Sequence, residues 1–454
     1  MGSEVKVKVV HKETIRPSSP TPHHLRFFSL SIFYQLSLPL YVPLLLFDPN
    51  NDDHQHSFVV QRTKLLKSSL SESLTRFYHF AGRVLDNASV CCNDQGVMFL
   101  EAKVICTISR VLITPNPELL KNLIPSGATK RDTGYDLLLV QINFFECGGL
   151  AIGFNDSHKI IDACTLSKFV DSWAANTIGL NTGDDGVMCI HQLHNVATAS
   201  VFPPLDFFSI PPPILEFPLA MCTTRRFLFE SSKIARLKSQ AVSALVKNPT
   251  RVEVVSALIW KCAMQTSRAN TDGRRLPSAW CKKVNMRKVL AHPSAENLIG
   301  NLLGCFVAKS TGAESDDIQG LVAEMRKELD DFKESYSTND VGVDDMCELL
   351  AKFGELMHKD DIEIYNPTSW CRLPFYEANF GWGKSLMSIP ATEEFKNLIL
   401  LTDTSDGDGI EARLTLKVED MAIFENNEEL LAYACFYHFG ISSQALKHGS
   451  HVCR

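Results

Sequence analysis

The alternation of apolar and polar positions along the chain predicts strands and helices that follow one another throughout. The segment 138–145, with the sequence LLVQINFF, is typical of a largely buried strand. Turn residues follow, and the apolar run 150–154 predicts a second strand. We therefore expect a hairpin that leads the chain to His158. Farther on, apolar residues recur every three or four positions over 318–332, as in an amphipathic helix.

A proline-rich stretch divides the chain. Six prolines lie from Pro203 to Pro218. Because proline fixes φ and lacks a backbone donor, this stretch is neither a helix interior nor a central strand. Its many apolar residues favour a crossover packed against the protein over a flexible tether. With 454 residues the chain is long enough for two domains, and we predict an N-terminal domain over 1–200, the crossover over 201–220 and a C-terminal domain over 221–454.

Composition and charge exclude some classes of protein. The formal net charge of −7 argues against a nucleic-acid-binding protein, which needs concentrated basic surface. The 14 cysteines contain no C-x-x-C pair, which favours free thiols in a reducing compartment over a zinc site or a redox motif. The N-terminus lacks the apolar segment of a secretory signal, and the longest apolar run, 36–47, is too short to span a bilayer. We expect a cytoplasmic protein without nucleic-acid or membrane partners.

The candidate for chemistry is the H-x-x-x-D motif formed by His158 and Asp162. A neutral imidazole titrates near neutral pH and can accept a proton from an attacking hydroxyl, so His158 is a candidate general base. The motif alone is weak, because a histidine in a strand-to-helix turn beside a carboxylate gives the same pattern. A hydrolase is disfavoured, since the sequence has no G-x-S-x-G nucleophile motif. It also has no H-E-x-x-H site, and we expect no metal.

Further motifs resemble the BAHD acyltransferases of plants, whose marks are H-x-x-x-D in mid-chain and D-F-G-W-G towards the C-terminus. Here the second mark reads Asn379, Phe380, Gly381, Trp382 and Gly383. Other segments match the family in the family's order: 15–22, 74–83, 284–287, 300–301 and 408–412. The resemblance therefore runs through nearly the whole chain. Within the family it points to the vinorine synthase-like alkaloid acetyltransferase branch.

The resemblance implies an α/β protein with the two-domain fold of CoA-dependent acyltransferases, similar to chloramphenicol acetyltransferase, with a channel between the domains. His158 would lie in mid-channel and deprotonate the hydroxyl of a small-molecule alcohol, and acyl-CoA would enter from the other side. No permanently bound cofactor would be needed, because a thioester is already electrophilic. Trp382 or a backbone amide would stabilise the oxyanion. The protein would be a monomer, since one chain builds the channel.

The resemblance also assigns roles to other residues. Asp162 would turn away from His158 and form a structural ion pair, for which Arg287 is the candidate partner. Contacts with coenzyme A would come from five residues in the second half of the chain: Asn285, Arg287, Thr368, Ser369 and Trp370. The loop 379–383 would be mainly structural.

The acyl group is open to alternatives. A malonyl donor needs a cation in the acyl pocket, because an unpaired buried carboxylate is costly. Phe424 would border that pocket by analogy with the family and offers no countercharge, which favours acetyl-CoA over malonyl-CoA as the donor. Phe424 and the nearby Met421 are equally well explained as core residues. By the same resemblance, the acceptor would be an alkaloid alcohol.

Three positions depart from the family's pattern. Asn379 replaces an aspartate and would weaken a loop-holding ion pair to a hydrogen bond. Tyr34 stands where many relatives have aspartate, near the acceptor channel, and would reshape the substrate pocket. Ser385 replaces a proline. These departures motivate a second hypothesis, a non-catalytic relative that binds a metabolite, against which the intact His158 argues.

Overall fold

The computed structural model describes most of the chain: residues 5–37, 40–48, 57–84, 89–113, 117–126, 130–131, 134–182, 221–271, 273–274, 276–290, 295–311, 316–336, 354, 362–388 and 395–437. The predicted crossover at 201–220 lies outside these residues, so its structure stays a prediction. No helix within the described ranges is long and apolar enough to cross a membrane.

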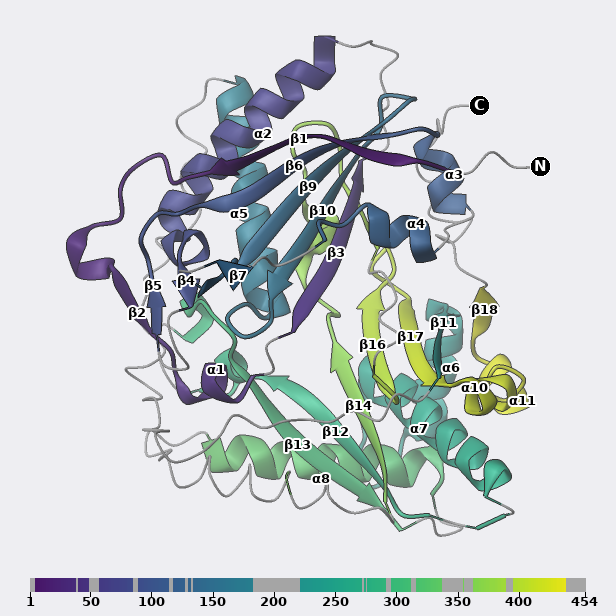
Figure 1. Cartoon of the computed structure of the whole chain (residues 1–454). Helices are drawn as coiled ribbons and strands as arrows, with labels where there is room; N and C mark the ends of the chain where they lie inside the picture. The colour runs from purple at the N-terminus through teal and green to yellow at the C-terminus, as the bar shows by residue number, and fades with distance from the viewer. Residues whose placement is uncertain are drawn as a thin grey trace.

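Two large sheets, each with helices packed on it, make up the described part of the chain (Figure 1). The strands are β1 (Val7–Ile15), β2 (Phe27–Ser29), β3 (Tyr41–Asp48), β4 (Arg83–Val84), β5 (Ser89–Cys91), β6 (Val97–Val104), β7 (Lys130–Arg131), β8 (Gly134–Tyr135), β9 (Leu138–Phe145), β10 (Leu150–Ser157), β11 (Cys222–Phe229), β12 (Ser278–Asn285), β13 (Leu303–Ser310), β14 (Glu363–Ser369), β15 (Leu386–Ser388), β16 (Leu398–Asp403), β17 (Ile410–Lys417) and β18 (Cys435–Tyr437). The α-helices are α1 (Ile32–Leu36), α2 (Ser57–Arg76), α3 (Ile108–Ile113), α4 (Pro117–Asn122), α5 (Ala163–Thr182), α6 (Ser231–Ala241), α7 (Arg251–Asn270), α8 (Ile318–Tyr336), α10 (Val418–Phe424) and α11 (Glu428–Leu431). Short 3-10 helices include η6 (Met286–Lys288) and η8 (Pro374–Glu377).

The strands and the helix predicted from the apolar pattern are confirmed. The two predicted strands are β9 and β10, and they form the expected antiparallel hairpin. Strand β9 is buried at all of its positions, which explains its nearly continuous apolar sequence. The predicted amphipathic helix is α8, which continues to Tyr336. The hairpin delivers the chain directly to His158, as the sequence predicts.

The first sheet has six strands in the order β1-β6-β9-β10-β3-β15. Helices α2 and α5 cover one face through a shared apolar core that includes Leu70 and Trp173. Helices α3 and α4 cover the other face through a smaller core that includes Val111 and Leu120. This two-sided burial fixes the register of the central strands, because a shift by one residue would exchange their two faces.

The second sheet has seven strands in the order β13-β12-β14-β16-β17-β11-β18. Helices α6, α7 and α8 pack on one face, and apolar residues such as Trp260 and Trp280 fill the space between. The opposite face points towards the first sheet, since Leu400 on β16 packs against the first sheet's core. Helix α8 lies on the outer side of this sheet, below β12 and β13 (Figure 1).

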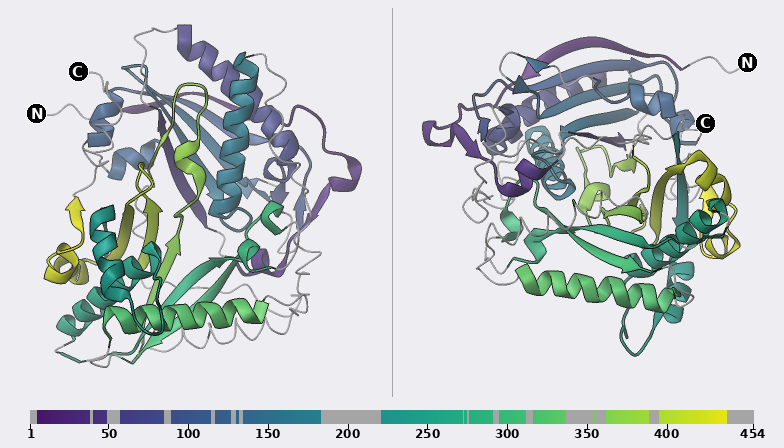
Figure 2. Two further views of the ribbon diagram at one scale, coloured as in Figure 1. Left: turned by 180° about the vertical axis from the view of Figure 1, so that it is seen from behind. Right: turned by 60° about the horizontal axis from the view of Figure 1, so that its bottom comes forward.

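The two halves of the chain interlock. Strand β15, from the second half, pairs with β3 and completes the first sheet. Just before it, η8 lies beside α5 (Figure 2). In return, Ile32 and Phe33 on α1 pack into the core of the second sheet. A boundary at 201–220 therefore does not separate the two sheets cleanly.

Candidate active site

The turn between β10 and α5 positions His158. The backbone N–H of His158 donates to the carbonyl of Leu40 at 2.7 Å. Its Nδ1 lies 3.0 Å from the carbonyl oxygen of Ile161. A carbonyl oxygen only accepts hydrogen bonds, so Nδ1 carries the proton and Nε2 is the basic nitrogen. The turn thus fixes both the orientation and the tautomer that a general base requires.

The environment keeps His158 neutral. Burial lowers its pKa, while the Ile161 carbonyl and the charge of Asp162 raise it and the charge of Lys283 lowers it, and the net pKa is below the ordinary value of 6.5. A neutral imidazole near pH 7 can take a proton from a hydroxyl.

Asp162 turns away from the imidazole and caps helix α5. Its carboxylate accepts the backbone N–H of Thr165 at 2.7 Å and that of Leu302 at 3.0 Å. The third partner is Arg287, whose Nη1 lies 2.7 Å from Oδ2. Burial alone would raise the pKa of Asp162, but the Arg287 charge and these hydrogen bonds outweigh it and hold the pKa below 3.8. The ion pair predicted from the resemblance is therefore present in the structure.

Arg287 uses its whole guanidinium group inside the protein. Nη1 donates to Asp162 and to Asn285 Oδ1, Nη2 donates to Thr165 Oγ1 and to the carbonyl of Gly300, and Nε donates to the carbonyl of Leu298. These bonds account for the five N–H groups that an arginine side chain has. Arg287 is also 3% exposed. The predicted contact of Arg287 with coenzyme A is therefore wrong for this guanidinium.

Tyr34 is a buried packing residue. Its ring is 0% exposed and its hydroxyl donates to the carbonyl of Ile299 at 3.0 Å. Gly300 has a φ of +126°, and a Cβ built there would lie 1.4 Å from the Tyr34 hydroxyl. Only glycine fits at this position. The prediction that Tyr34 lines the substrate pocket is wrong, because the ring fills the contact between α1 and the residues before β13.

Sequence reasoning missed two residues that hold this site together. Asn301 donates from Nδ2 to the carbonyl of His158 at 2.5 Å and to Ser37 Oγ at 2.8 Å. Thr165 Oγ1 accepts from Arg287 and from the backbone of Gly300. The sequence could have indicated Thr165, because it is the third residue of α5, and the backbone N–H at that position donates to an N-cap aspartate such as Asp162. For Asn301 the sequence offered only the match of residues 300–301 to the family, which does not indicate its hydrogen bonds.

The other predicted contacts with coenzyme A lie on the second sheet. Asn285 ends β12, and its Oδ1 accepts the backbone N–H of Arg287 at 3.1 Å. Thr368 and Ser369 end β14 and are half-buried. Trp370 follows them, and its ring lies 5.4 Å from that of Phe375. Their contacts with coenzyme A stay predictions.

The loop 379–383 closes on itself through Asn379. Its Oδ1 accepts the backbone N–H groups of Gly381 at 2.8 Å and Gly383 at 3.1 Å. Both glycines have positive φ, +96° and +115°, which explains why glycine is required. Phe380 packs edge-on against Trp173 with centroids 5.2 Å apart. The partners of Asn379 are thus backbone amides, and the ion pair expected at this position in the family has no counterpart here.

Trp382 lies at the far end of the first sheet from His158. At one end of β3, Tyr41 pairs with Ser157, next to His158, and near the other end Phe47 pairs with Leu386 of β15. The six residue-to-residue steps from Tyr41 to Phe47 span roughly 20 Å of extended chain. Trp382 precedes Leu386 and lies beyond that end, where Arg62 stacks on its ring at 4.8 Å. The prediction that Trp382 stabilises the oxyanion is therefore wrong.

Phe424 belongs to the core of the second sheet. It is 0% exposed, and its ring meets that of Phe227 edge-on at 5.5 Å. Met421 is buried in the same core. The interpretation of both as core residues is the one that the structure supports, and Phe424 no longer favours acetyl over malonyl.

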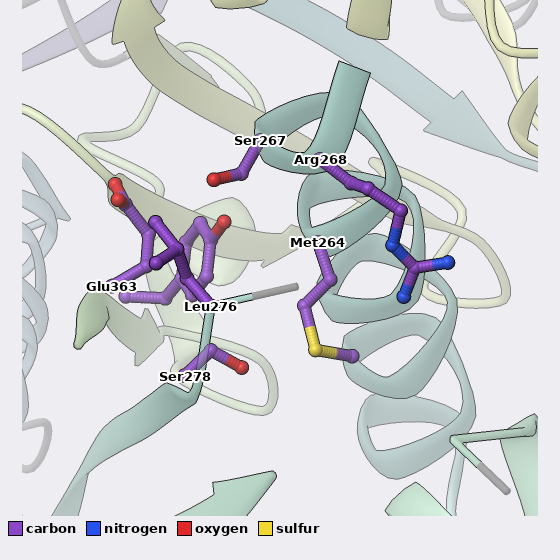
Figure 3. A pocket seen from close by; sticks show the side chains of 7 residues that line it. Met264, Ser267, Arg268, Leu276, Ser278 and Glu363 are labelled. Atoms are coloured by element: carbon purple, nitrogen blue, oxygen red, sulfur yellow. The ribbon is translucent and has the colours of Figure 1, made fainter. Parts of the chain in front are cut away.

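One hollow lies outside this region, between the end of α7 and the starts of β12 and β14 (Figure 3). It is lined by Met264, Arg268, Ser278, Glu363, Tyr365 and two neighbours. Its empty volume is about 260 Å³. That volume includes open solvent, and the enclosed space is about that of one water molecule, so this hollow is too small for coenzyme A and an acceptor.

Among the described residues, one group has the arrangement of a metal site: His11, Glu13 and Glu101, on the neighbouring strands β1 and β6. The ammonium of Lys67 pairs with both carboxylates. Because that ammonium supplies the positive charge, we assign the group to a surface ion-pair network.

Comparison with known proteins identifies the family. The Transferase family matches residues 5–431. The chain belongs to this family, that of the BAHD acyltransferases. It is 35% identical to 17,18-epoxy-17-hydroxycur-19-ene N-malonyltransferase of Strychnos nux-vomica, over 94% of this chain and 90% of the relative. It is 34% identical to minovincinine 19-hydroxy-O-acetyltransferase of Catharanthus roseus, over 95% and 98%.

The fold agrees with this membership. The crystal structure of vinorine synthase is similar with a TM-score of 0.80 at 34% identity, over 94% of this chain and 98% of that one. The predicted α/β acyltransferase fold is therefore confirmed.

Proposed function

We propose that this BAHD acyltransferase transfers an acyl group from acyl-CoA to a hydroxyl of a plant alkaloid, with His158 as the general base. The observation that carries the proposal is the turn around His158, which leaves Nε2 as the basic nitrogen of a neutral imidazole. The relatives named above support the acceptor class, since both act on alkaloid-type substrates by name.

The reaction needs few groups from the protein. The acceptor hydroxyl gives its proton to Nε2 of His158 as its oxygen attacks the thioester carbonyl. The tetrahedral intermediate then collapses, the carbon–sulfur bond breaks, and the imidazolium returns the proton to the thiolate of coenzyme A. Because Trp382 is distant, we assign the oxyanion to a backbone amide.

Asp162 takes part only as a positioning residue. Its carboxylate is used by Arg287, Leu302 and Thr165, so it holds the start of α5 and with it the turn of His158. Coenzyme A acts as a substrate, and the proposal includes no resident cofactor. The described cysteines are all free thiols, which supports a reducing, cytoplasmic location, and we propose a monomer.

The donor has two candidates, acetyl-CoA and malonyl-CoA. One named relative is an O-acetyltransferase and another an N-malonyltransferase at almost the same identity, so similarity alone does not choose between them.

The test is acyl transfer from acetyl-CoA and malonyl-CoA to a panel of alkaloid alcohols, with wild type beside His158→Ala. We expect product from wild type and a loss of about 10²- to 10⁴-fold in kcat/KM for the variant. The thermal unfolding of His158→Ala serves as the control for folding. Failure of wild type to bind either acyl-CoA or to form any product would favour the non-catalytic, metabolite-binding hypothesis.

A further inference from the structure

Two arginines and one glutamate meet on neighbouring strands of the second sheet. Arg226 on β11 pairs directly with Arg413 on β17. The carboxylate of Glu411 binds both of them: Oε2 lies 2.6 Å from Nη2 of Arg226, and Oε1 lies 2.9 Å from Nε of Arg413. Like charges directly opposite each other on paired strands repel, and one carboxylate balances only one guanidinium group. With two positive charges and one negative charge, the three side chains have a net charge of +1.

Arg413 has hydrogen-bond donors that the cluster does not use. An arginine side chain has five N–H groups, and here the one on Nε donates to Glu411. Within the part of the chain that the structure describes, neither Nη1 nor Nη2 of Arg413 has a hydrogen-bond partner. The side chain is 18% exposed, so these groups are within reach of solvent. Arg287, in contrast, is 3% exposed and uses all of its N–H groups inside the protein. The N–H groups on Nη1 and Nη2 of Arg413 are thus available to a ligand.

Arg413 lies on the face of the second sheet that is turned away from α7. Side chains alternate along β17, and Ala412 and Leu414, on the other face, belong to the core that includes α7. Arg413 pairs with Leu400, which packs against the core of the first sheet. Leu400 pairs in turn with Thr368, for which a contact with coenzyme A is predicted. Two strand spacings, roughly 10 Å, therefore separate Arg413 from Thr368 on the same face.

Tyr376 adds a neutral donor beside this cluster. It lies on η8 and packs against the core of the first sheet. Burial and the charge of Glu411 raise the pKa of Tyr376, whereas the charges of Arg413 and Arg226 lower it, which places the phenol near all three side chains. Because the net pKa is above its ordinary value, the hydroxyl keeps its proton at neutral pH and can donate it. Among the described residues the hydroxyl has no hydrogen-bond partner.

We propose that Arg413 and Tyr376 bind an anionic oxygen group of a substrate, either a phosphate of coenzyme A or a carboxylate of the acceptor. This inference rests on the proposed function. The Nη1 and Nη2 groups of a guanidinium form a planar fork that matches the oxygens of a phosphate or a carboxylate. Glu411 repels such a group, but the two arginines outweigh it, since the net charge of the cluster is positive.

The variants are Arg413→Met, Arg413→Lys and, as the matched control, Arg225→Met. Removal of Arg413 leaves Glu411 paired with Arg226 at 2.6 Å, so Arg413→Met creates no unpaired buried carboxylate and is expected to fold. Thermal unfolding checks this. Arg225 precedes Arg226 on β11 and therefore lies on the other face of the sheet. Its side chain is 24% exposed, similar to that of Arg413, and pairs with Glu425 at 3.0 Å.

The first arm measures the binding of acetyl-CoA and of S-acetylpantetheine by calorimetry. The second compound has the same thioester and the same arm but no phosphate. If the anion is a phosphate, we expect Arg413→Met to weaken acetyl-CoA binding about tenfold and S-acetylpantetheine binding less than about twofold. Arg413→Lys recovers part of the loss, because it keeps the charge without the fork, and Arg225→Met leaves both affinities unchanged.

The second arm compares the binding of an alkaloid alcohol that has a free carboxylate with the binding of its methyl ester. If the anion is a carboxylate, wild type prefers the acid, and Arg413→Met reduces that preference about tenfold without a change for acetyl-CoA. Unchanged values in both arms, or an equal loss for acetyl-CoA and S-acetylpantetheine, would overturn the assignment of Arg413, and the proposed function would stand. Absence of acetyl-CoA and malonyl-CoA binding by wild type would instead count against the proposed function itself.

Discussion

The two family motifs occupy opposite ends of strand β3 and do different work. At one end the His158 turn lies against residues of the second sheet, through Asn301 and the Asp162–Arg287 pair. At the other end the loop 379–383 packs on α2 and α5, through Arg62 and Trp173. One motif thus carries the proposed general base, and the other fastens the second half of the chain to the first. Two sequence motifs that identify a family equally well can therefore lie in different parts of the structure.

The two ends of β3 also differ in the pKa of the buried aspartate that lies at each of them. Asp162 has three hydrogen-bonding partners in Thr165, Leu302 and Arg287, and its pKa is lowered. Asp48, at the Trp382 end of β3, is 6% exposed, and burial raises its pKa to about 7 although the charge of Arg62 opposes the shift. The partners of Asp162 therefore outweigh the effect of burial on its pKa, whereas at Asp48 burial outweighs the charge of Arg62.

The largest expected effect on stability comes from breaking the buried ion pair between Asp162 and Arg287. Arg287→Met leaves the carboxylate of Asp162 buried without its cation, and we expect the free energy of unfolding to fall by about 3–5 kcal/mol. Chemical denaturation measures it. Lys288→Met, one residue along and exposed, is the control and should change stability by less than about 0.5 kcal/mol. A loss below 1 kcal/mol for Arg287→Met would mean that the pair does not hold the two halves together.

At the other end of β3, the raised pKa of Asp48 predicts a pH effect of opposite sign to that of Asp162. The raised pKa of Asp48, about 7 against 3.8, means that the folded state binds the proton more tightly. Stability is therefore present at low pH and is lost as pH rises from about 4 through 7. Between pH 5 and pH 8 the loss from this group is about 2–3 kcal/mol.

Asp48→Asn tests this, because the amide does not titrate. Denaturation at several pH values should give a flatter dependence for the variant than for wild type. Parallel curves for the two proteins would show that Asp48 is ionised in the folded state throughout this range.

Trp382→Leu separates stability from chemistry. The variant loses the contact with Arg62 and the stacking on Phe380, whose centroid lies 6.5 Å away. We expect a loss of about 1–2 kcal/mol in the free energy of unfolding. Because the ring lies far from His158, kcat/KM per folded molecule should be unchanged. His158→Ala gives the reverse pattern, and a fall in kcat with intact folding for Trp382→Leu would place the indole in the reaction after all.

Sequence reasoning succeeded where the partners are local or are named by a motif. The hairpin ending at His158 followed from apolar runs, and the Asp162–Arg287 pair followed from two motif residues. It failed for Trp382 and left Phe424 open between core and acyl pocket, because their surroundings depend on the register of β15 on β3 and on the packing of α10.

The smallest expected effect concerns the residue that departs from the family pattern, Asn379. Its Oδ1 accepts two backbone N–H groups, and Asn379→Ala removes that acceptor from a partly exposed loop. We expect a loss of about 1 kcal/mol, whereas Asn379→Asp keeps the acceptor and adds charge, for a gain of at most about 1 kcal/mol. Thermal unfolding at low and high salt distinguishes the two, because only the aspartate's gain is screened. A salt-sensitive gain well above this value would show that the aspartate finds a cation as well as the two amides, and that the asparagine costs this chain an ion pair. No gain in stability would show that position 379 needs only an acceptor for the two backbone N–H groups, and that asparagine stabilises the loop as well as aspartate does.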